Sequence, residues 1–249
     1  MQQKIIQKLN QIAREKNVKI LYAVESGSRA WGFASPDSDY DIRFIYQHEK
    51  EHYLSLWEKP DTIEFMTQDD LDGSGWDLRK AMILLAKSNT ALLEWIYSPV
   101  VYYENEDFLK QLRDLAKECF SPIACLHHYL GTTKNFMDVC QAEEVKLKSY
   151  FYALRTALAG QWIIAKNTFP PVDFLELLPI APLEIQEKVK ELMEIKANQD
   201  EKYLHPKETL ITNFLIETIK YNQENVSTLE SGKKNSEKMD TVFKEILDY

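Results

Sequence analysis

The chain has 249 residues, which is enough to bury a core in one large domain or two modest ones. Its composition of 45% apolar and 28% charged residues is typical of soluble proteins, and its net charge of -9 excludes a global positive field for nucleic acid. Three cysteines without metal-ligand spacing, and no apolar stretch of membrane-span length, indicate free thiols, a cytoplasmic location and no membrane partner.

The first hundred residues alternate between helical and β-type patterns. Apolar residues that recur every three or four positions indicate helices, and short β-rich or alternating runs indicate strands. In chain order the patterns predict a helix at 3–16, a strand at 18–24, a short helix at 29–32, strands at 39–46 and 62–66, a loop or strand end at 71–75, helices at 77–87 and 92–97, and an edge strand at 100–103.

Beyond residue 104 the pattern is helical. The predicted helices lie near 106–118, 122–140, 144–166, 182–197, 207–223 and 238–248. We therefore predict an α+β protein: a small mixed β-sheet with flanking helices at 1–103, followed by an all-α, bundle-like domain at 104–249. The polar tail, residues 225–249, is expected to be partly mobile.

One segment carries the chemistry, namely Gly27-Ser28 followed by Asp39-Tyr40-Asp41. Residues two apart in a strand point to the same face, so Asp39 and Asp41 are expected to project together. Two such carboxylates repel each other unless a cation lies between them, and Mg²⁺ is commonly bound by one or two carboxylates plus substrate phosphates. Gly27 permits close approach of the backbone to a ligand. Ser28 offers a hydroxyl for a phosphate.

These parts suit nucleotidyl transfer, in which phosphates need charge neutralisation and in-line positioning. The arrangement resembles the DNA polymerase beta superfamily of nucleotidyltransferases, whose signature is Gly-Ser, a short helix, and Asp-x-Asp on the next strand. Gly27-Ser28 and Asp39-x-Asp41 match that signature residue by residue. The resemblance implies a nucleotidyltransferase catalytic domain at 1–103, two Mg²⁺ (or Mn²⁺) ions and a nucleoside triphosphate as co-substrate.

The likeness extends along the chain. It includes the stretch from Gly73 to Lys80, the short motifs Lys87-Ser88-Asn89, Leu93-Glu94-Trp95 and Ser98-Pro99, and the stretch from Lys148 to Arg155 followed by Trp162. These motifs resemble the RNA-ligase-associated, YcgL-type branch of the superfamily over roughly residues 18–175. The resemblance implies a minimal core with an appended helical domain. It leaves the acceptor open among an RNA end, a protein hydroxyl and a small molecule.

The superfamily places a third acid on a neighbouring strand, and two residues compete for this position. Asp72 directly precedes the Gly73–Trp76 turn and is our first candidate. Glu64 lies in the predicted strand at 62–66 between two apolar residues and is the alternative. The predicted metal ligands are therefore Asp39, Asp41 and Asp72.

Two polar residues near the motif are further candidates for nucleotide binding. Arg29 follows the Gly-Ser pair and could contact a phosphate, or could equally pair with Asp37 or Glu25. Ser38 is expected to brace the loop that leads to Asp39. Arg43 lies on the strand face of the acids, and an ion pair with them is the favoured interpretation.

Lys148, Tyr152 and Arg155 are spaced i, i+4 and i+7, so they share one helix face. Such a face could clamp a triphosphate and stack a base, or could be a polar surface that counters Glu143 and Glu144. The leading hypothesis is thus an enzyme that moves a nucleoside monophosphate to a hydroxyl. The alternatives are a non-catalytic or antitoxin-like nucleotide-binding partner module and, less favoured, a phosphohydrolase.

Overall fold

The computed structural model describes residues 1–68, 70–233 and 235–248 of an α+β protein. The chain forms two compact units. Unit 1 comprises Met1–Ala30, Asp39–Cys119 and Lys233–Tyr249, and unit 2 comprises Trp31–Ser38 and Phe120–Gly232. The chain therefore passes between the units after residues 30, 38, 119 and 232. These divisions differ from the boundary at residue 103 expected from the sequence.

Unit 1 contains a five-stranded mixed sheet with the strand order β3-β4-β2-β1-β5. Its strands are β1 (Lys19–Glu25), β2 (Tyr40–Gln47), β3 (Thr62–Met66), β4 (Leu71–Asp77) and β5 (Val101–Glu104). The central pair, β2 and β4, is parallel, whereas every other neighbouring pair is antiparallel. The small mixed sheet predicted from the sequence is confirmed.

The glycine-rich segment at 71–75 was expected to be a loop or strand end, and this expectation is wrong. The segment belongs to β4, which pairs with strands on both sides. A Cβ atom on Gly73 would lie 2.0 Å from the Phe65 ring, and one on Gly75 would lie 2.1 Å from the Phe44 ring. These glycines make room for aromatic rings that pack on the sheet, so here they do not mark a turn.

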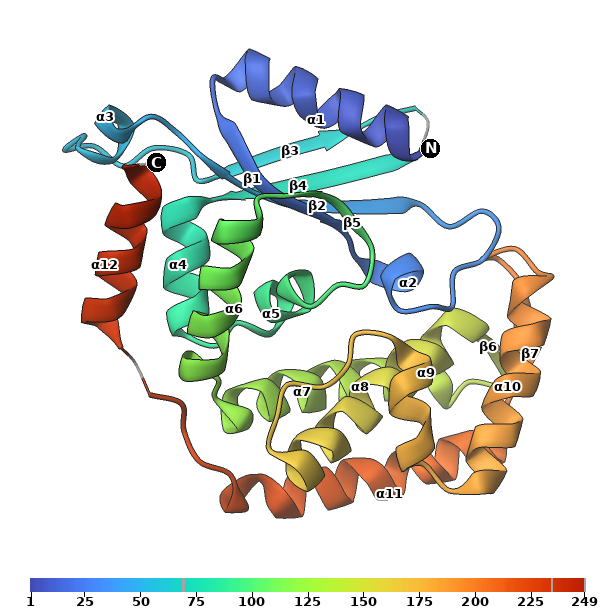
Figure 1. Cartoon of the computed structure of the whole chain (residues 1–249). Coiled ribbons are helices and arrows are strands. Elements are labelled where there is room, and N and C mark those ends of the chain that lie inside the picture. The colour runs from blue at the N-terminus through green and yellow to red at the C-terminus, as the bar shows by residue number, and fades with distance from the viewer. Residues whose placement is uncertain (69, 234, 249) are drawn as a thin grey trace. The chain divides into compact units, whose positions relative to one another are not determined.

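The two faces of the sheet are covered by different helices (Figure 1). The amphipathic helix α1 (Gln2–Lys16) buries Ile5, Leu9 and Ile12 against one face, where Ile42 and Phe44 of β2 point. The opposite face packs against α4 (Leu78–Ala86), and Trp95 of α5 (Thr90–Ile96) lies against Trp76 of β4 with ring centroids 3.9 Å apart. Because side chains alternate along β2, Asp41 and Arg43 point to the α4 and α5 side.

The remaining helices of unit 1 are α2 (Gly27–Ala30), α3 (Lys50–Tyr53), α6 (Glu106–Cys119) and α12 (Ser236–Leu247). Helix α6 has one apolar face and packs on α4 and α5, and α12 packs on α4 and α6. Both helices lie beyond residue 103, and their apolar faces complete the core of unit 1. Within the tail expected to be mobile, α12 buries Met239, Val242 and Ile246. Positions 234 and 249 of that tail lie outside the described residues.

Unit 2 is mainly helical, as predicted. Its elements are α7 (Pro122–Cys140), β6 (Glu144–Lys146), α8 (Leu147–Lys166), α9 (Phe174–Leu177), η1 (Leu178–Ile180), α10 (Leu183–Ala197), β7 (Leu204–Pro206), α11 (Thr209–Asn225) and η2 (Val226–Thr228). The helix expected at 144–166 begins at Leu147, because residues 144–146 pair with β7 as a short antiparallel ribbon. Three-residue strands are too short to produce a recognisable pattern of alternation.

The short segment Trp31–Ser38 joins α2 to β2 but packs within unit 2. Phe33 is buried and stacks on Phe151 with ring centroids 5.3 Å apart. All three cysteines are buried free thiols, as expected. Across the described residues, none of the helices combines the length and apolar character that a membrane span requires.

Candidate active site

The register of the parallel strands brings two of the predicted acids together. Asp41 of β2 lies directly opposite Asp72 of β4. The Arg43 guanidinium lies between them, with Nη2 2.9 Å from Asp41 Oδ1 and 3.2 Å from Asp72 Oδ2. The expected ion pair of Arg43 is therefore confirmed. Both carboxylates form ion pairs with the Arg43 guanidinium, so together they form a shared site for positive charge.

Gly27 is required where it stands because Asp41 packs against its backbone. Its φ of +60° lies in the left-handed region that favours glycine. A Cβ atom at this position would lie 2.0 Å from Asp41 Oδ2. The Ser26 amide also donates to the Asp41 carbonyl at 2.8 Å. The Gly27 backbone therefore lies close to the Asp41 carboxylate at the start of α2, and the predicted close approach of Gly27 to a ligand stays a prediction.

Glu25 is a buried acid beside Asp41 that the sequence did not single out as a candidate. It ends β1, is 1% exposed, and accepts a hydrogen bond from the Asp41 amide at 2.7 Å through Oε1. Its other carboxylate oxygen accepts a hydrogen bond from the Tyr102 hydroxyl. Burial raises the pKa of the Glu25 carboxyl. The available signal was an acidic residue that ends an apolar strand directly before the Gly-Ser pair.

Asp39 and Arg29 lie at the entrance to β2. Asp39 is exposed directly before the strand, and its carbonyl accepts a hydrogen bond from Arg29 Nε at 3.1 Å. The Arg29 guanidinium lies 3.9 Å from the centre of the Tyr40 ring. Arg29 therefore holds the backbone at Asp39 in place. Ser28, which follows Gly27 in α2, is half-buried. Among the described residues no ion pair engages the Asp39 carboxylate, so its charge faces solvent.

The two candidates for the third acid occupy different rows of the sheet. Asp72 shares a row with Asp41. Glu64 is exposed on β3 and lies opposite Ser74, in the row that contains Arg43. The geometry therefore favours Asp72 as the acid that could share a cation with Asp41. The assignment of the third carboxylate stays a prediction.

In unit 2, Ser38 and Lys148 converge on a residue that the sequence did not indicate. Ser38 Oγ donates to Glu201 Oε1 at 3.0 Å, and Lys148 Nζ lies 2.7 Å from Glu201 Oε2. Ser38 Oγ also accepts a hydrogen bond from the Ser35 amide, which braces the loop before Asp39 as expected. Buried Lys196 donates to Ser35 Oγ at 2.6 Å, and burial lowers the pKa of its ammonium group.

The other two residues of the predicted helix face lie in the core of unit 2. Arg155 is 2% exposed, donates through Nε to the Val172 carbonyl at 3.2 Å, and has its guanidinium 4.4 Å from the Trp31 ring centre. The Tyr152 ring meets Trp31 edge-on with centroids 4.9 Å apart. Of the three residues, only Lys148 has a substantially exposed side chain, at 41%. A nucleotide contact by Tyr152 or Arg155 stays a prediction.

The sequence matches the model of the RlaP family, described as the RNA repair pathway DNA polymerase beta family, over residues 1–245. The chain belongs to this family. The resemblance found in the Gly-Ser and Asp-x-Asp motifs is thus confirmed over nearly the whole length of this RlaP-family protein. The family assignment identifies it as a relative of polymerase beta-type nucleotidyltransferases.

A curated relative and two solved structures are similar to this RlaP-family chain. YcgL of Bacillus subtilis (strain 168) is 45% identical over 238 residues, covering 94% of this chain and 92% of that protein. Spectinomycin adenyltransferase AAD(9) from Enterococcus faecialis, solved with ATP and spectinomycin, is 14% identical with a TM-score of 0.44, over 86% of this chain and 98% of that one. A nucleotidyltransferase-like protein from Exiguobacterium sibiricum 255-15 is 12% identical with a TM-score of 0.32, and the match covers 89% of this chain and 74% of that one. Likenesses this low carry no inference about substrate.

Proposed function

We propose that this protein transfers a nucleoside monophosphate from a nucleoside triphosphate to a free hydroxyl at an RNA end. The observation that carries the proposal is the pair Asp41 and Asp72, set side by side by the β2–β4 register. The description of the family, which refers to an RNA repair pathway, favours an RNA end over a protein hydroxyl or a small molecule as the acceptor. The net charge of -9 means that RNA would have to bind through a local surface.

The residues present fit divalent cations. Both carboxylates already bind one positive group, the Arg43 guanidinium, through one oxygen each. We propose that Asp39, Asp41 and Asp72 hold two Mg²⁺ or Mn²⁺ ions. When bound, such ions neutralise the triphosphate and keep the reacting oxygens in line.

The proposed reaction forms one bond and breaks one. The acceptor hydroxyl oxygen attacks the α-phosphorus, the bond from that phosphorus to the oxygen leading to the β-phosphate breaks, and pyrophosphate leaves. Asp72 accepts the hydroxyl proton and passes it to water. Asp72 lies in the row of Asp41 and is 39% exposed, so an acceptor from solvent can reach it. Glu64, one row away, remains the alternative base.

Other residues have proposed roles in binding the triphosphate. Ser28 follows Gly27 directly, and its hydroxyl is our candidate for a contact to the β- and γ-phosphates. Arg29, held by Asp39 and Tyr40, would add a positive charge beside them. In unit 2, Lys148 forms an ion pair with Glu201, and a nucleotide contact by Lys148 stays a prediction.

The test is transfer of label from each of the four α-labelled nucleoside triphosphates to RNA. Short RNAs with a free 3′-hydroxyl, a 3′-phosphate or a 5′-hydroxyl are supplied with Mg²⁺ or Mn²⁺, alongside spectinomycin and a protein acceptor. We expect labelled RNA and released pyrophosphate only where a free hydroxyl is present. Asp41→Asn should abolish transfer, whereas the exposed control Asp138→Asn should not change it.

Three other results would overturn the proposal in distinguishable ways. Label on the small molecule or the protein would identify a different acceptor. Free labelled nucleoside monophosphate without acceptor modification would indicate a phosphohydrolase. Nucleotide binding without turnover, together with a stably co-purifying chain, would indicate a non-catalytic partner module.

A further inference from the structure

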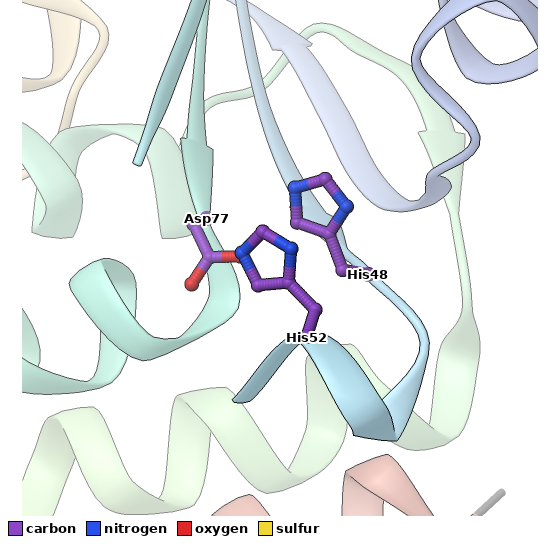
Figure 2. Close-up of side chains that lie close together, drawn as sticks. All are labelled: His48, His52 and Asp77. Atoms are coloured by element: carbon purple, nitrogen blue, oxygen red, sulfur yellow. The ribbon is translucent and has the colours of Figure 1, made fainter. Parts of the chain in front are cut away.

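A second cluster of ligand-type side chains lies where the β2–β4 pair ends. His48 follows β2, His52 lies in α3, and Asp77 is the last residue of β4. One nitrogen from each histidine and one carboxylate oxygen of Asp77 all lie within 4.8 Å of one another (Figure 2). The two imidazole rings stack, with centroids 3.6 Å apart and planes 8° from parallel.

This cluster is separate from the acids of the candidate active site. Asp72 and Asp77 are five residues apart on one extended strand, which at about 3.3 Å per residue places them roughly 16 Å apart. Neither histidine belongs to a motif that the proposed nucleotidyl transfer uses. The cluster therefore needs an explanation of its own.

The donors define the kind of ion. Two imidazole nitrogens and one carboxylate are a characteristic set for zinc and neighbouring transition metals, whereas Mg²⁺ and Ca²⁺ select oxygen donors. Asp77 is 4% exposed as a residue, and a metal ion would compensate the buried charge of its carboxylate.

Hydrogen bonds already orient the Asp77 carboxylate, as the outer shell of a metal site does. The Tyr53 hydroxyl donates to Asp77 Oδ2 at 2.8 Å and accepts from the His48 amide at 3.1 Å. The Arg79 amide donates to Asp77 Oδ1 at 2.8 Å. A carboxylate has about four lone-pair positions, so Asp77 keeps acceptor capacity for a cation after these two bonds.

The stacked rings must move for both to bind one ion. Ligands of a tetrahedral zinc lie about 2.1 Å from the metal and so about 3.4 Å from each other. The lone pairs of two parallel rings run side by side, so one imidazole has to turn about its side-chain bonds. His52 is the ring with room to turn, because it lines an open cavity of about 300 Å³ together with Asp77. The same cavity gives the ion an entry path and supplies water for a remaining coordination position.

We propose that His48, His52 and Asp77 bind one divalent transition-metal ion of the zinc class. The ion would join three points of unit 1, namely the end of β2, the helix α3 and the end of β4. Binding to the folded form alone would stabilise the protein. It would also unstack the two imidazoles, which gives the site a signature independent of catalysis.

The experiment uses the full chain without a histidine tag, stripped with a chelator and titrated with Co²⁺ and then Zn²⁺. Co²⁺ reports nitrogen ligation through its visible absorption, and metal content is measured after dialysis. We expect one equivalent of Zn²⁺ to displace Co²⁺, a higher Tm, and shifted imidazole NMR signals of His48 and His52. His52→Ala should weaken binding about tenfold or more. The exposed control His127→Ala should bind like the wild type.

Several results would overturn the proposal. Unchanged affinity in both His52→Ala and His52→Gln, each folded by circular dichroism, would exclude the cluster, as would failure of the wild type to retain Zn²⁺. Loss of the ion from Asp41→Asn with retention in His52→Ala would assign it to the acid pair. None of these readouts depends on nucleotidyl transfer, so the site and the proposed function fail independently.

Discussion

At the start of the parallel pair β2–β4, Asp41 and Asp72 share one guanidinium, whereas at its end Asp77 lies beside two imidazoles. Parallel register explains both groups, because Asp41 pairs with Asp72 and Tyr46 pairs with Asp77 along the same ladder. The first end offers oxygen donors, which suit Mg²⁺ and Mn²⁺. The second offers nitrogen donors, which suit zinc. One pair of strands can therefore carry two sites whose chemistry is set by the residues at each end.

The largest expected effect separates the two candidates for the third acid. Asp72→Asn should reduce kcat by about a hundredfold or more, because it removes a proton acceptor and a cation ligand beside Asp41. Glu64→Gln should change kcat by less than about threefold, since Glu64 lies one row away from Asp41 and is exposed. Steady-state transfer rates check both. The reverse ranking would assign the third acid to Glu64.

The next largest effect is expected at Gly27, whose backbone packs against the Asp41 carboxylate. Gly27→Ala introduces a Cβ 2.0 Å from Asp41 Oδ2 at a φ of +60°. We expect a loss of about 1–3 kcal/mol of stability and displacement of the carboxylate, with transfer reduced at least about tenfold. Urea denaturation and transfer rates measure the two effects.

Gly131→Ala is the matched control for that substitution. A Cβ there meets no atom within 4 Å, and the residue lies inside α7. This variant should keep full activity and gain about 0.5–1 kcal/mol of stability. If Gly27→Ala behaved like Gly131→Ala, the close contact with Asp41 would not matter for function.

A smaller effect tests whether the two ends are chemically distinct. Paramagnetic Mn²⁺ should broaden backbone NMR signals around Asp41 and Asp72 before those around His48 and His52, because Mn²⁺ prefers carboxylate oxygens. In His52→Ala the Mn²⁺-dependent transfer rate should stay within about twofold of the wild type, since the two ends lie roughly 16 Å apart. Simultaneous broadening at both ends would remove the distinction.

The smallest effect concerns the pH dependence of stability through Glu25. Burial raises the pKa of this carboxyl in the folded state above its unfolded value. Its stabilising contribution is therefore complete below the unfolded pKa and is lost as pH rises through the folded pKa. Relative to Glu25→Gln, the wild type should lose free energy of unfolding as the pH rises above the ordinary pKa of a glutamate carboxyl. Parallel pH dependences in urea denaturation would contradict this account.

Part of the candidate active site could be predicted because its motif is continuous in the sequence. The order of Gly27-Ser28 and Asp39-x-Asp41 indicates a strand, a turn and a second strand, and the structure contains them. The partner of Asp41 was harder to identify, because Asp72 becomes its neighbour only through long-range pairing of β2 with β4. The β4 strand was also hard to predict because it contains glycines, which are needed there to leave room for two aromatic rings from neighbouring strands.

The unpredicted residues share a physical cause, namely contacts between distant parts of the chain. Glu201 meets Ser38 and Lys148 from far along the sequence, and Lys196 reaches Ser35 in the same way. Helical spacing correctly placed Lys148, Tyr152 and Arg155 on one face, but spacing alone does not show whether a face meets solvent or core. Arg155 is buried in the core, where its guanidinium packs on the Trp31 ring and donates a hydrogen bond to the Val172 carbonyl.

The segment Trp31–Ser38 has a consequence for how this protein can be divided. It joins the Gly-Ser turn to the strand of acids, yet Phe33 is buried in unit 2. A truncation after residue 119 would remove the packing partners of that segment. Phe33, which lies between the Gly-Ser and Asp-x-Asp motifs, would then be exposed. The helical half is therefore not a detachable module, and a gene fragment encoding only the sheet should yield an aggregation-prone product. Evolutionary exchange of unit 2 would have to preserve the pocket for Phe33.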